Sequence, residues 1–122
     1  MRWLLHGTMT PAVGEALRRH GHQAQAVSEL ELGADAMAGD VLTAAHTRQL
    51  DILTTDQTMA NAPFELQQKF GRTIVFLQLE GGDVEQDDAV DRLFARYKRL
   101  APGKLYTVTG TRVKIRQLPG AH

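Results

Sequence analysis

The sequence predicts an α/β domain in which a mostly parallel central sheet carries helices on both faces. Short apolar runs alternate with stretches of helical spacing, as in β-α-β units with right-handed crossovers. The run Thr73–Leu79 is largely apolar, as expected of a central strand. Two short strands that flank Gly110 then predict a C-terminal β-hairpin.

The first quarter of the chain predicts a β-α-β unit. Arg2–His6 is expected to form the first strand. Thr10 suits the cap of the following helix, Pro11 suits its first position, and a glycine ends it. His22–Val27 is a second strand, rich in Gln and Ala, and Ser28–Gly39 is a loop or an irregular short helix.

The middle of the chain repeats the alternation. Val41–Gln49 predicts a helix with small apolar residues facing inward. Leu50–Asp56 follows as a buried strand that ends in polar side chains. Gln57–Asn61 is expected to form one helical turn, and Pro63–Phe70 a helix that carries two apolar residues four positions apart.

The last helix has the strongest pattern in the chain. Gly81 and Gly82 form a hinge-like break, after which Asp83 can cap the helix and Gln86 can complete a capping box. The helix then carries an apolar stripe that should pack on the sheet. The stripe consists of Val90, Leu93, Phe94, Tyr97 and Leu100.

The hairpin strands are Leu105–Thr109 and Arg112–Gln117. In the second of these, Val113 and Ile115 should face one side, and the basic side chains the other.

Length and composition bound the classes of function. The chain has 122 residues, enough for a single domain over 1–122, and 43% of them are hydrophobic. The absence of cysteine excludes disulfides, zinc–thiolate sites and thiol catalysis, and it fits a cytoplasmic protein. The N-terminal apolar run is too short for a signal peptide, and no run is long enough to span a membrane.

Charge is unevenly distributed along this chain of zero net charge. Residues 92–122 hold eight basic side chains and no acid, whereas the first 91 residues have a net charge of −8. The asymmetry fits an acidic metal site beside a phosphate-facing basic edge. It fits charge pairing within the chain or between subunits equally well.

Two chemistry-bearing residues should meet at one edge of the sheet. His6 and Asp56 follow two predicted parallel strands, and ligands of such sheets bind outside the carboxyl ends of the strands. Asp40, at the start of a predicted helix, could join them. Two carboxylates and an imidazole suit Mg²⁺ or Mn²⁺, which can activate water in phosphate hydrolysis.

Each candidate also has a plain structural interpretation. Asp56 suits the N-cap of the next helix, and Asp40 suits a helix N-terminus. His6 could be a partly buried, hydrogen-bonded histidine. The basic side chains of the last strand could contact phosphates or protect an exposed edge by charge. They are Arg112, Lys114 and Arg116.

The chain resembles a short PIN-like domain of the branch that includes toxin components of bacterial toxin–antitoxin pairs. The resemblance covers nearly the whole chain. It rests on the order and spacing of Arg2–Pro11, Leu17–His22, Leu53–Asp56 and Leu105–Pro119. It implies a PIN-like, Rossmann-like three-layer sandwich with a mostly parallel central sheet and a C-terminal hairpin.

The resemblance also implies a function. PIN-like toxins are typically Mg²⁺- or Mn²⁺-dependent endoribonucleases, so the chain is a candidate hydrolase that acts on RNA. The catalytic and metal-binding residues would be Asp56, Asp40 and His6, with Asp35 as a rival of Asp40. Arg112, Lys114 and Arg116 would contact RNA. Expected partners are RNA and a cognate antitoxin-like protein. The oligomeric state stays open, with a dimer as one option.

The acidic residues depart from the family pattern. His6 and Gly7 stand where the family has acids at the end of the first strand, and Thr58 stands where it has a second acid after Asp56. The alternative function is therefore a catalytically degraded PIN-like module that binds RNA or a protein partner.

Overall fold

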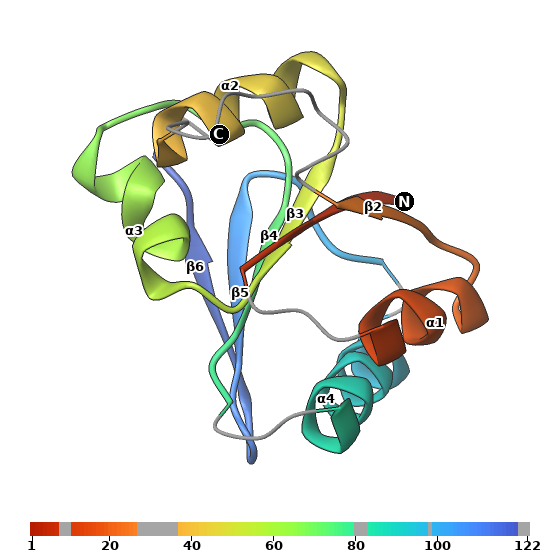
Figure 1. Ribbon diagram of the computed structural model, residues 1–122. Helices are drawn as coiled ribbons and strands as arrows, with labels where there is room; N and C mark the ends of the chain where they lie inside the picture. Colours follow the sequence, from red (N-terminus) through yellow and green to blue (C-terminus); the bar gives the residue numbers. More distant parts are fainter. Residues whose placement is uncertain (8–10, 27–36, 80–82, 98, 120–122) are drawn as a thin grey trace.

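The structure of the chain is a computed structural model that describes residues 1–7, 11–26, 37–79, 83–97 and 99–119. Six strands form one sheet, and helices lie against both of its faces (Figure 1). In chain order the elements are β1 (Arg2–His6), α1 (Pro11–Arg19), β2 (Gln23–Ala26), α2 (Ala38–Thr47), β3 (Asp51–Thr54), α3 (Gln57–Glu65), β4 (Ile74–Leu77), α4 (Asp83–Arg96), β5 (Lys104–Val108) and β6 (Val113–Gln117).

The sheet is mixed but mostly parallel, as the sequence predicts. Its strand order is β2-β1-β3-β4-β5-β6, and every neighbouring pair is parallel except the C-terminal hairpin of β5 and β6. The predicted central strand is confirmed, because β4 lies between β3 and β5 and all four of its residues are buried. β2 and β6 form the two edges.

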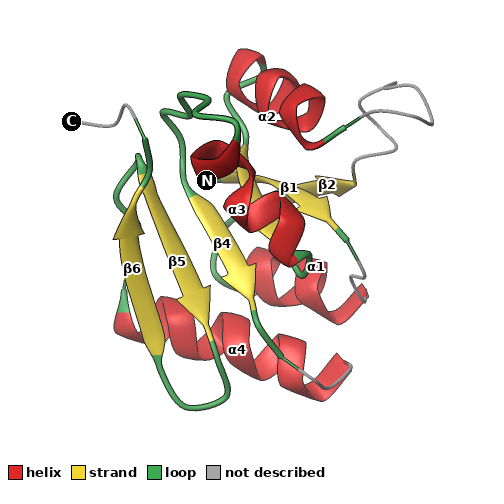
Figure 2. Cartoon of the chain, turned by 90° about the vertical axis from the view of Figure 1, so that its left-hand side faces the viewer, coloured by secondary structure: helices red, strands yellow, loops and turns green. Residues whose placement is uncertain are grey.

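Alternate residues of the strands bury on opposite faces of the sheet. The face covered by α2 and α3, here called the α3 face, includes Leu4, Ile74 and Leu105. The face covered by α1 and α4, here called the α4 face, includes Trp3 and Tyr106. Figure 2 shows α3 in front of the sheet and α4 behind it. The result is a three-layer α/β/α arrangement.

One crossover differs in hand from the others. The connections β3–α3–β4 and β4–α4–β5 both step toward β6, yet their helices lie on opposite faces of the sheet. Two parallel crossovers that step the same way with helices on opposite faces must have opposite hands. Figure 2 shows β5 to the left of the downward-pointing β4, with α4 behind the sheet, which is a left-handed connection. The expectation of right-handed crossovers throughout is therefore wrong for the connection through α4.

The helix after β3 also differs from its prediction. A single helix, α3, spans Gln57–Glu65 with Pro63 inside it, in place of one turn and a second helix from Pro63 to Phe70. The Asp56 side chain caps this helix, and Pro63 packs into its buried face, which outweighs the proline penalty. Phe70 is fully buried but lies beyond the helix.

Other boundaries shift by a few residues. α2 begins at Ala38 rather than Val41, and α4 ends at Arg96, before the predicted stripe residues Tyr97 and Leu100. Leu100 is nevertheless buried on the α4 face. Several predicted features lie outside the described residues: Thr10 as a cap, most of the Ser28–Gly39 segment, the Gly81–Gly82 break and the side chain of Asp83.

A partly buried indole–imidazole hydrogen bond links β1 to the residue before β2. The Nε1–H of the fully buried Trp3 donates to His22 Nδ1 over 2.9 Å, and the Phe94 ring lies 4.5 Å from the His22 ring. An indole can only donate, so His22 must keep Nδ1 unprotonated. Burial lowers the pKa of His22, and the positive charges of the N-terminus and His20 lower it further.

We expect the protein to lose stability as the pH falls below about 6.5, the ordinary value for histidine. A pKa that is lower in the folded state means that the unfolded chain takes up the proton more readily, so acid favours unfolding. The loss should be about 1 kcal/mol, the value of one hydrogen bond. Urea unfolding at pH 7.5 and pH 5 measures it. His22→Gln, whose amide oxygen can accept from Trp3, is the control, and parallel pH profiles for the two proteins would contradict the prediction.

In the part of the chain that the structure describes, no helix is both long enough and apolar enough to cross a bilayer.

Candidate functional site

The candidate site lies where the sheet changes direction. β1 and β3 are neighbours, but the chain leaves β1 toward β2 and leaves β3 toward β4, with α1 and α3 on opposite faces. At such a switch point the two connections diverge and leave a crevice at the carboxyl ends of the strands. His6 and Thr54 end these strands and are register partners. The predicted meeting of His6 with the region of Asp56 is therefore correct.

A hydrogen-bonded cluster connects these strand ends. Thr54 Oγ1 accepts from the backbone N–H of Asp56 at 2.9 Å and lies 2.9 Å from His6 Nδ1. Burial lowers the pKa of His6, and the Asp56 carboxylate offsets the shift only in part. The fold therefore favours the neutral imidazole over the charged one. When Nδ1 accepts from the Thr54 hydroxyl, Nε2 carries the ring proton.

Gly7 fits this site for a steric reason. Its φ is +88°, and a Cβ atom at this position would lie 2.6 Å from Thr55 Oγ1. A side chain would clash and would also strain the backbone. The acid that the PIN-like pattern has at this position therefore has no room here.

Asp56 has a structural role at the start of α3. Its Oδ1 accepts from the backbone N–H of Thr58 at 2.9 Å, the geometry of an N-cap. Its side chain is exposed, so the second carboxylate oxygen can still meet a ligand.

Asp40 does not join His6 and Asp56. Its carboxylate accepts from the backbone N–H of Met37 at 3.0 Å and caps α2. The neighbouring Gly39 carbonyl accepts from Gln68, which follows the end of α3, whereas Asp56 lies at the start of α3. The two acids are thus associated with opposite ends of this helix. Asp40 lies in the first turn of α2, and Figure 2 shows α2 near the end of the sheet where β4 begins, not where it ends.

The described side chains do not form a complete set of metal ligands. Among them, no three His, Asp or Glu residues form a group that could hold a metal ion. Asp35, the rival of Asp40, lies outside the described residues. His6 and Asp56 would leave most ligand positions of Mg²⁺ or Mn²⁺ to water or to substrate phosphate.

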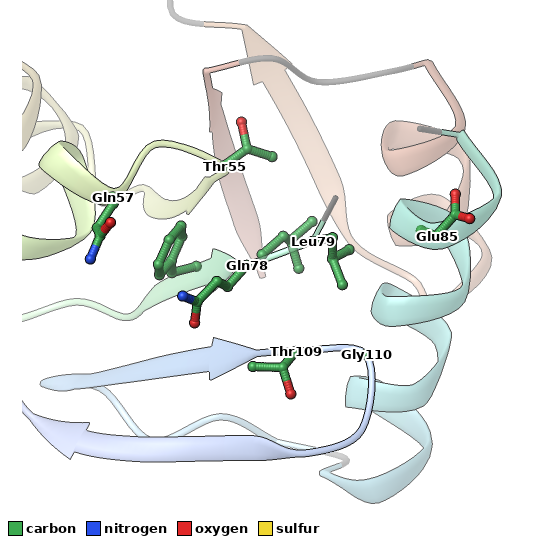
Figure 3. Close-up of a pocket in the computed structure, with 9 residues that line it drawn as sticks. Thr55, Gln57, Gln78, Leu79, Glu85, Thr109 and Gly110 are labelled. Atoms are coloured by element: carbon green, nitrogen blue, oxygen red, sulfur yellow. The ribbon is translucent and has the colours of Figure 1, made fainter. Parts of the chain in front are cut away.

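A cleft of about 930 Å³ opens beside this cluster. Figure 3 shows Thr55 and Gln57 on one side, Gln78 and Leu79 after β4, Glu85 on α4 across from them, and Thr109 at the β5–β6 turn. The lining is mostly uncharged and can both donate and accept hydrogen bonds. Thr55, which lies between Thr54 and Asp56 in the chain, connects the cleft to the His6 cluster.

A second hollow, of about 430 Å³, continues from the cleft over the α3 face of β5 and β6. We call it the groove. The cleft and the groove share Gln57, Phe76 and Gln78. The other residues that line the groove are Asn61, Leu105, Thr107, Lys114, Ile115 and Arg116.

The basic residues of the last strand divide into two groups. Lys114 and Arg116 line the groove, and the Arg116 guanidinium lies 3.8 Å from the centre of the Phe64 ring, a cation–π contact. Arg112 precedes β6 and does not line the groove. Its backbone N–H donates to Thr109 Oγ1. The position of β6 at the sheet edge also agrees with edge protection by charge.

The amides of the cleft and groove were missed at the sequence level. Gln57, Asn61 and Gln78 form no motif and no spacing that indicates a site. The available signal was weak: Gln57 follows Asp56 directly, and Gln78 follows the central strand, so both lie at the carboxyl edge.

Comparison of the chain with protein-family models, with curated proteins and with solved structures finds no match in any of the three.

Proposed function

We propose that the chain is a PIN-like module that binds single-stranded RNA along the cleft and the groove. The observation that carries the proposal is their continuity: a polar cleft at the switch point leads into a groove bordered by Lys114 and Arg116. RNA needs cations for its phosphates and hydrogen-bonding groups for its base edges.

The two cations have different roles in this proposal. Arg116 is held in place by its stacking on Phe64, so it can present a fixed guanidinium to a phosphate at little further entropic cost. Lys114 is exposed and lies opposite Thr107 on β5, one step nearer the cleft. The side-chain amides of Gln57, Asn61 and Gln78 would then contact RNA bases that point away from the phosphate backbone.

We expect Lys114→Ala with Arg116→Ala to weaken RNA binding equally for all sequences. The slope of log K against log salt should fall by about 1.4, since each single-strand phosphate contact contributes about 0.7. Fluorescence anisotropy with a labelled 12-nucleotide RNA, titrated at several KCl concentrations, measures the slope.

The matched control is Arg99→Ala with Lys104→Ala. Both side chains are exposed cations near the start of β5, and neither lines the cleft or the groove. This control keeps the same net charge as the test variant. Equal slopes in the two double variants would mean that Lys114 and Arg116 do not contact RNA phosphates and serve only to protect the sheet edge.

A second proposal is that the chain is a Mg²⁺- or Mn²⁺-dependent ribonuclease of toxin type with a reduced acidic site. The observation that favours it is the position of His6 beside Asp56 at the switch point. A metal ion bound there would neutralise phosphate charge and activate water. His6 and Asp56 would be its protein ligands, or His6 would move a proton at Nε2. The test of this proposal is the rebuilt acidic site described in the Discussion.

A further inference from the structure

The edge strand β6 offers an open hydrogen-bonding edge. Thr109 N–H donates to Arg112 O, and Leu118 N–H donates to Gly103 O, both at 2.9 Å. The register between these two bonds pairs Tyr106 with Ile115. Antiparallel strands alternate bonded and non-bonded pairs, so the backbone groups of Val113 and Ile115 point away from β5, toward the edge.

The two faces of this edge differ in chemistry. On the α3 face, Lys114 and Arg116 stand opposite Thr107 and Leu105. On the α4 face, Val113 packs against the core. Ile115 borders the groove, but it pairs with Tyr106, which belongs to the α4 face, so its side chain lies on that face, where it is 45% exposed. A strand added beside β6 would therefore meet cations on one face and apolar side chains on the other.

Charge argues against a second copy of β6 as that strand. Pairing β6 with itself would bring Lys114 and Arg116 beside the same cations of the other copy, and no acid occurs anywhere in residues 92–122. Like charges on neighbouring strands are destabilising. A strand with acidic side chains would be attracted instead, because its carboxylates would lie next to these cations.

We propose that β6 accepts an extended segment of a partner protein as a seventh strand, and that this segment alternates acidic and apolar residues. Its backbone bonds to Val113 and Ile115. Its acidic side chains contact Lys114 and Arg116 on the α3 face, and its apolar side chains cover Ile115 on the α4 face. The mode is strand addition, in which backbone bonds supply affinity and alternate side chains supply specificity.

The probe is a fluorescently labelled eight-residue peptide that alternates Glu and Val. Anisotropy should show saturable binding of this peptide to the full chain. A peptide of the same composition, with the four Glu residues before the four Val residues, should bind at least tenfold more weakly. An alternating Lys–Val peptide should not bind. Equal binding of the block peptide would overturn the proposal, because attraction by charge alone would then explain the result.

A backbone substitution tests the edge itself. Ile115→Pro removes the outward N–H without removing a bond to β5, and such positions on edge strands accept proline. The matched control, Ile115→Ala, loses the same apolar side chain but keeps the N–H. We expect the proline variant to bind the alternating peptide about tenfold more weakly than the alanine variant. Equal affinities would overturn the proposal.

A measurement on the unaltered chain covers the case in which the proline variant does not fold. Hydrogen exchange of the Ile115 amide, followed by NMR, should slow at least tenfold when the alternating peptide binds. An unchanged rate in the saturated complex would place the peptide elsewhere and overturn the proposal. Displacement of the peptide by self-association of the chain, seen as a dimer in sedimentation at the same concentration, would also overturn it.

Discussion

Replacing Asp51 with alanine is expected to lower the free energy of unfolding by about 3 kcal/mol. Asp51 begins β3, and its side chain is only 3% exposed. Its Oδ1 accepts from the backbone N–H of Thr73 at 2.9 Å, and its Oδ2 lies 3.3 Å from Arg72 Nη2. Alanine would leave both donors without this acceptor where β3 meets β4. Urea unfolding followed by circular dichroism measures the loss.

Two further variants isolate the cause. Burial raises the pKa of Asp51, and Thr73 and Arg72 lower it only in part, so the negative charge is held at a cost. Asp51→Asn keeps an acceptor for Thr73 and removes that cost, so it should lose much less stability than Asp51→Ala. Asp88→Ala, at an exposed position of α4, should stay within about 0.5 kcal/mol of the parent chain. A loss of 1 kcal/mol or less for Asp51→Ala would contradict the importance of these bonds.

Rebuilding the acidic site should create strong metal binding. His6→Asp with Thr58→Asp would place two new carboxylates beside Asp56. His6 already lies within electrostatic reach of Asp56, and the Thr58 backbone bonds to the Asp56 carboxylate. Three clustered carboxylates repel one another without metal, so the double variant should be less stable until a divalent ion binds. At an Mn²⁺ concentration of about 100 times Kd, binding adds roughly 2.7 kcal/mol.

Thermal unfolding with and without Mn²⁺ measures this effect, and cleavage of single-stranded RNA is the second measurement. The control adds Asp56→Asn to the double variant. Asparagine caps helices as well as aspartate does, so this change removes a ligand charge while α3 keeps its cap. The Mn²⁺-induced rise in Tm should shrink in this triple variant. A folded double variant with no gain in Mn²⁺ binding or cleavage would mean that these positions do not converge on one metal site.

Much of the fold could be predicted because short apolar runs alternate with stretches of helical spacing along the chain. The wholly buried β4 appears in the sequence as an apolar run, and the wholly buried β3 as the apolar pair Ile52 and Leu53 between polar residues. The start of α1 at Pro11 and the hairpin around Gly110 follow from local backbone preferences. The continuity of α3 through Pro63 could not be predicted in this way, because packing of its buried face overrides a local preference. The hand of the α4 crossover is likewise a property of the whole chain.

The candidate site could be predicted only in part. His6 and Asp56 could be paired from their positions after parallel strands, since such strands end at one edge. Asp40 was correctly expected at the start of a helix, which is α2. The local sequence does not indicate near which end of α3 the start of α2 would lie. The groove depends on how far α3 extends over the sheet, which no local pattern encodes.

The crossover through α4 has a consequence for how this protein can change over time. Because α4 packs on the face opposite α3, it leaves the α3 face of β5 and β6 open, and the routing of the chain creates the groove. Exposed residues at its border, such as Gln57, Gln78 and Lys114, contribute little to the core. Substitutions of such residues usually change stability by less than about 0.5 kcal/mol. Substitutions on this surface can therefore change which ligands it binds without destabilising the fold.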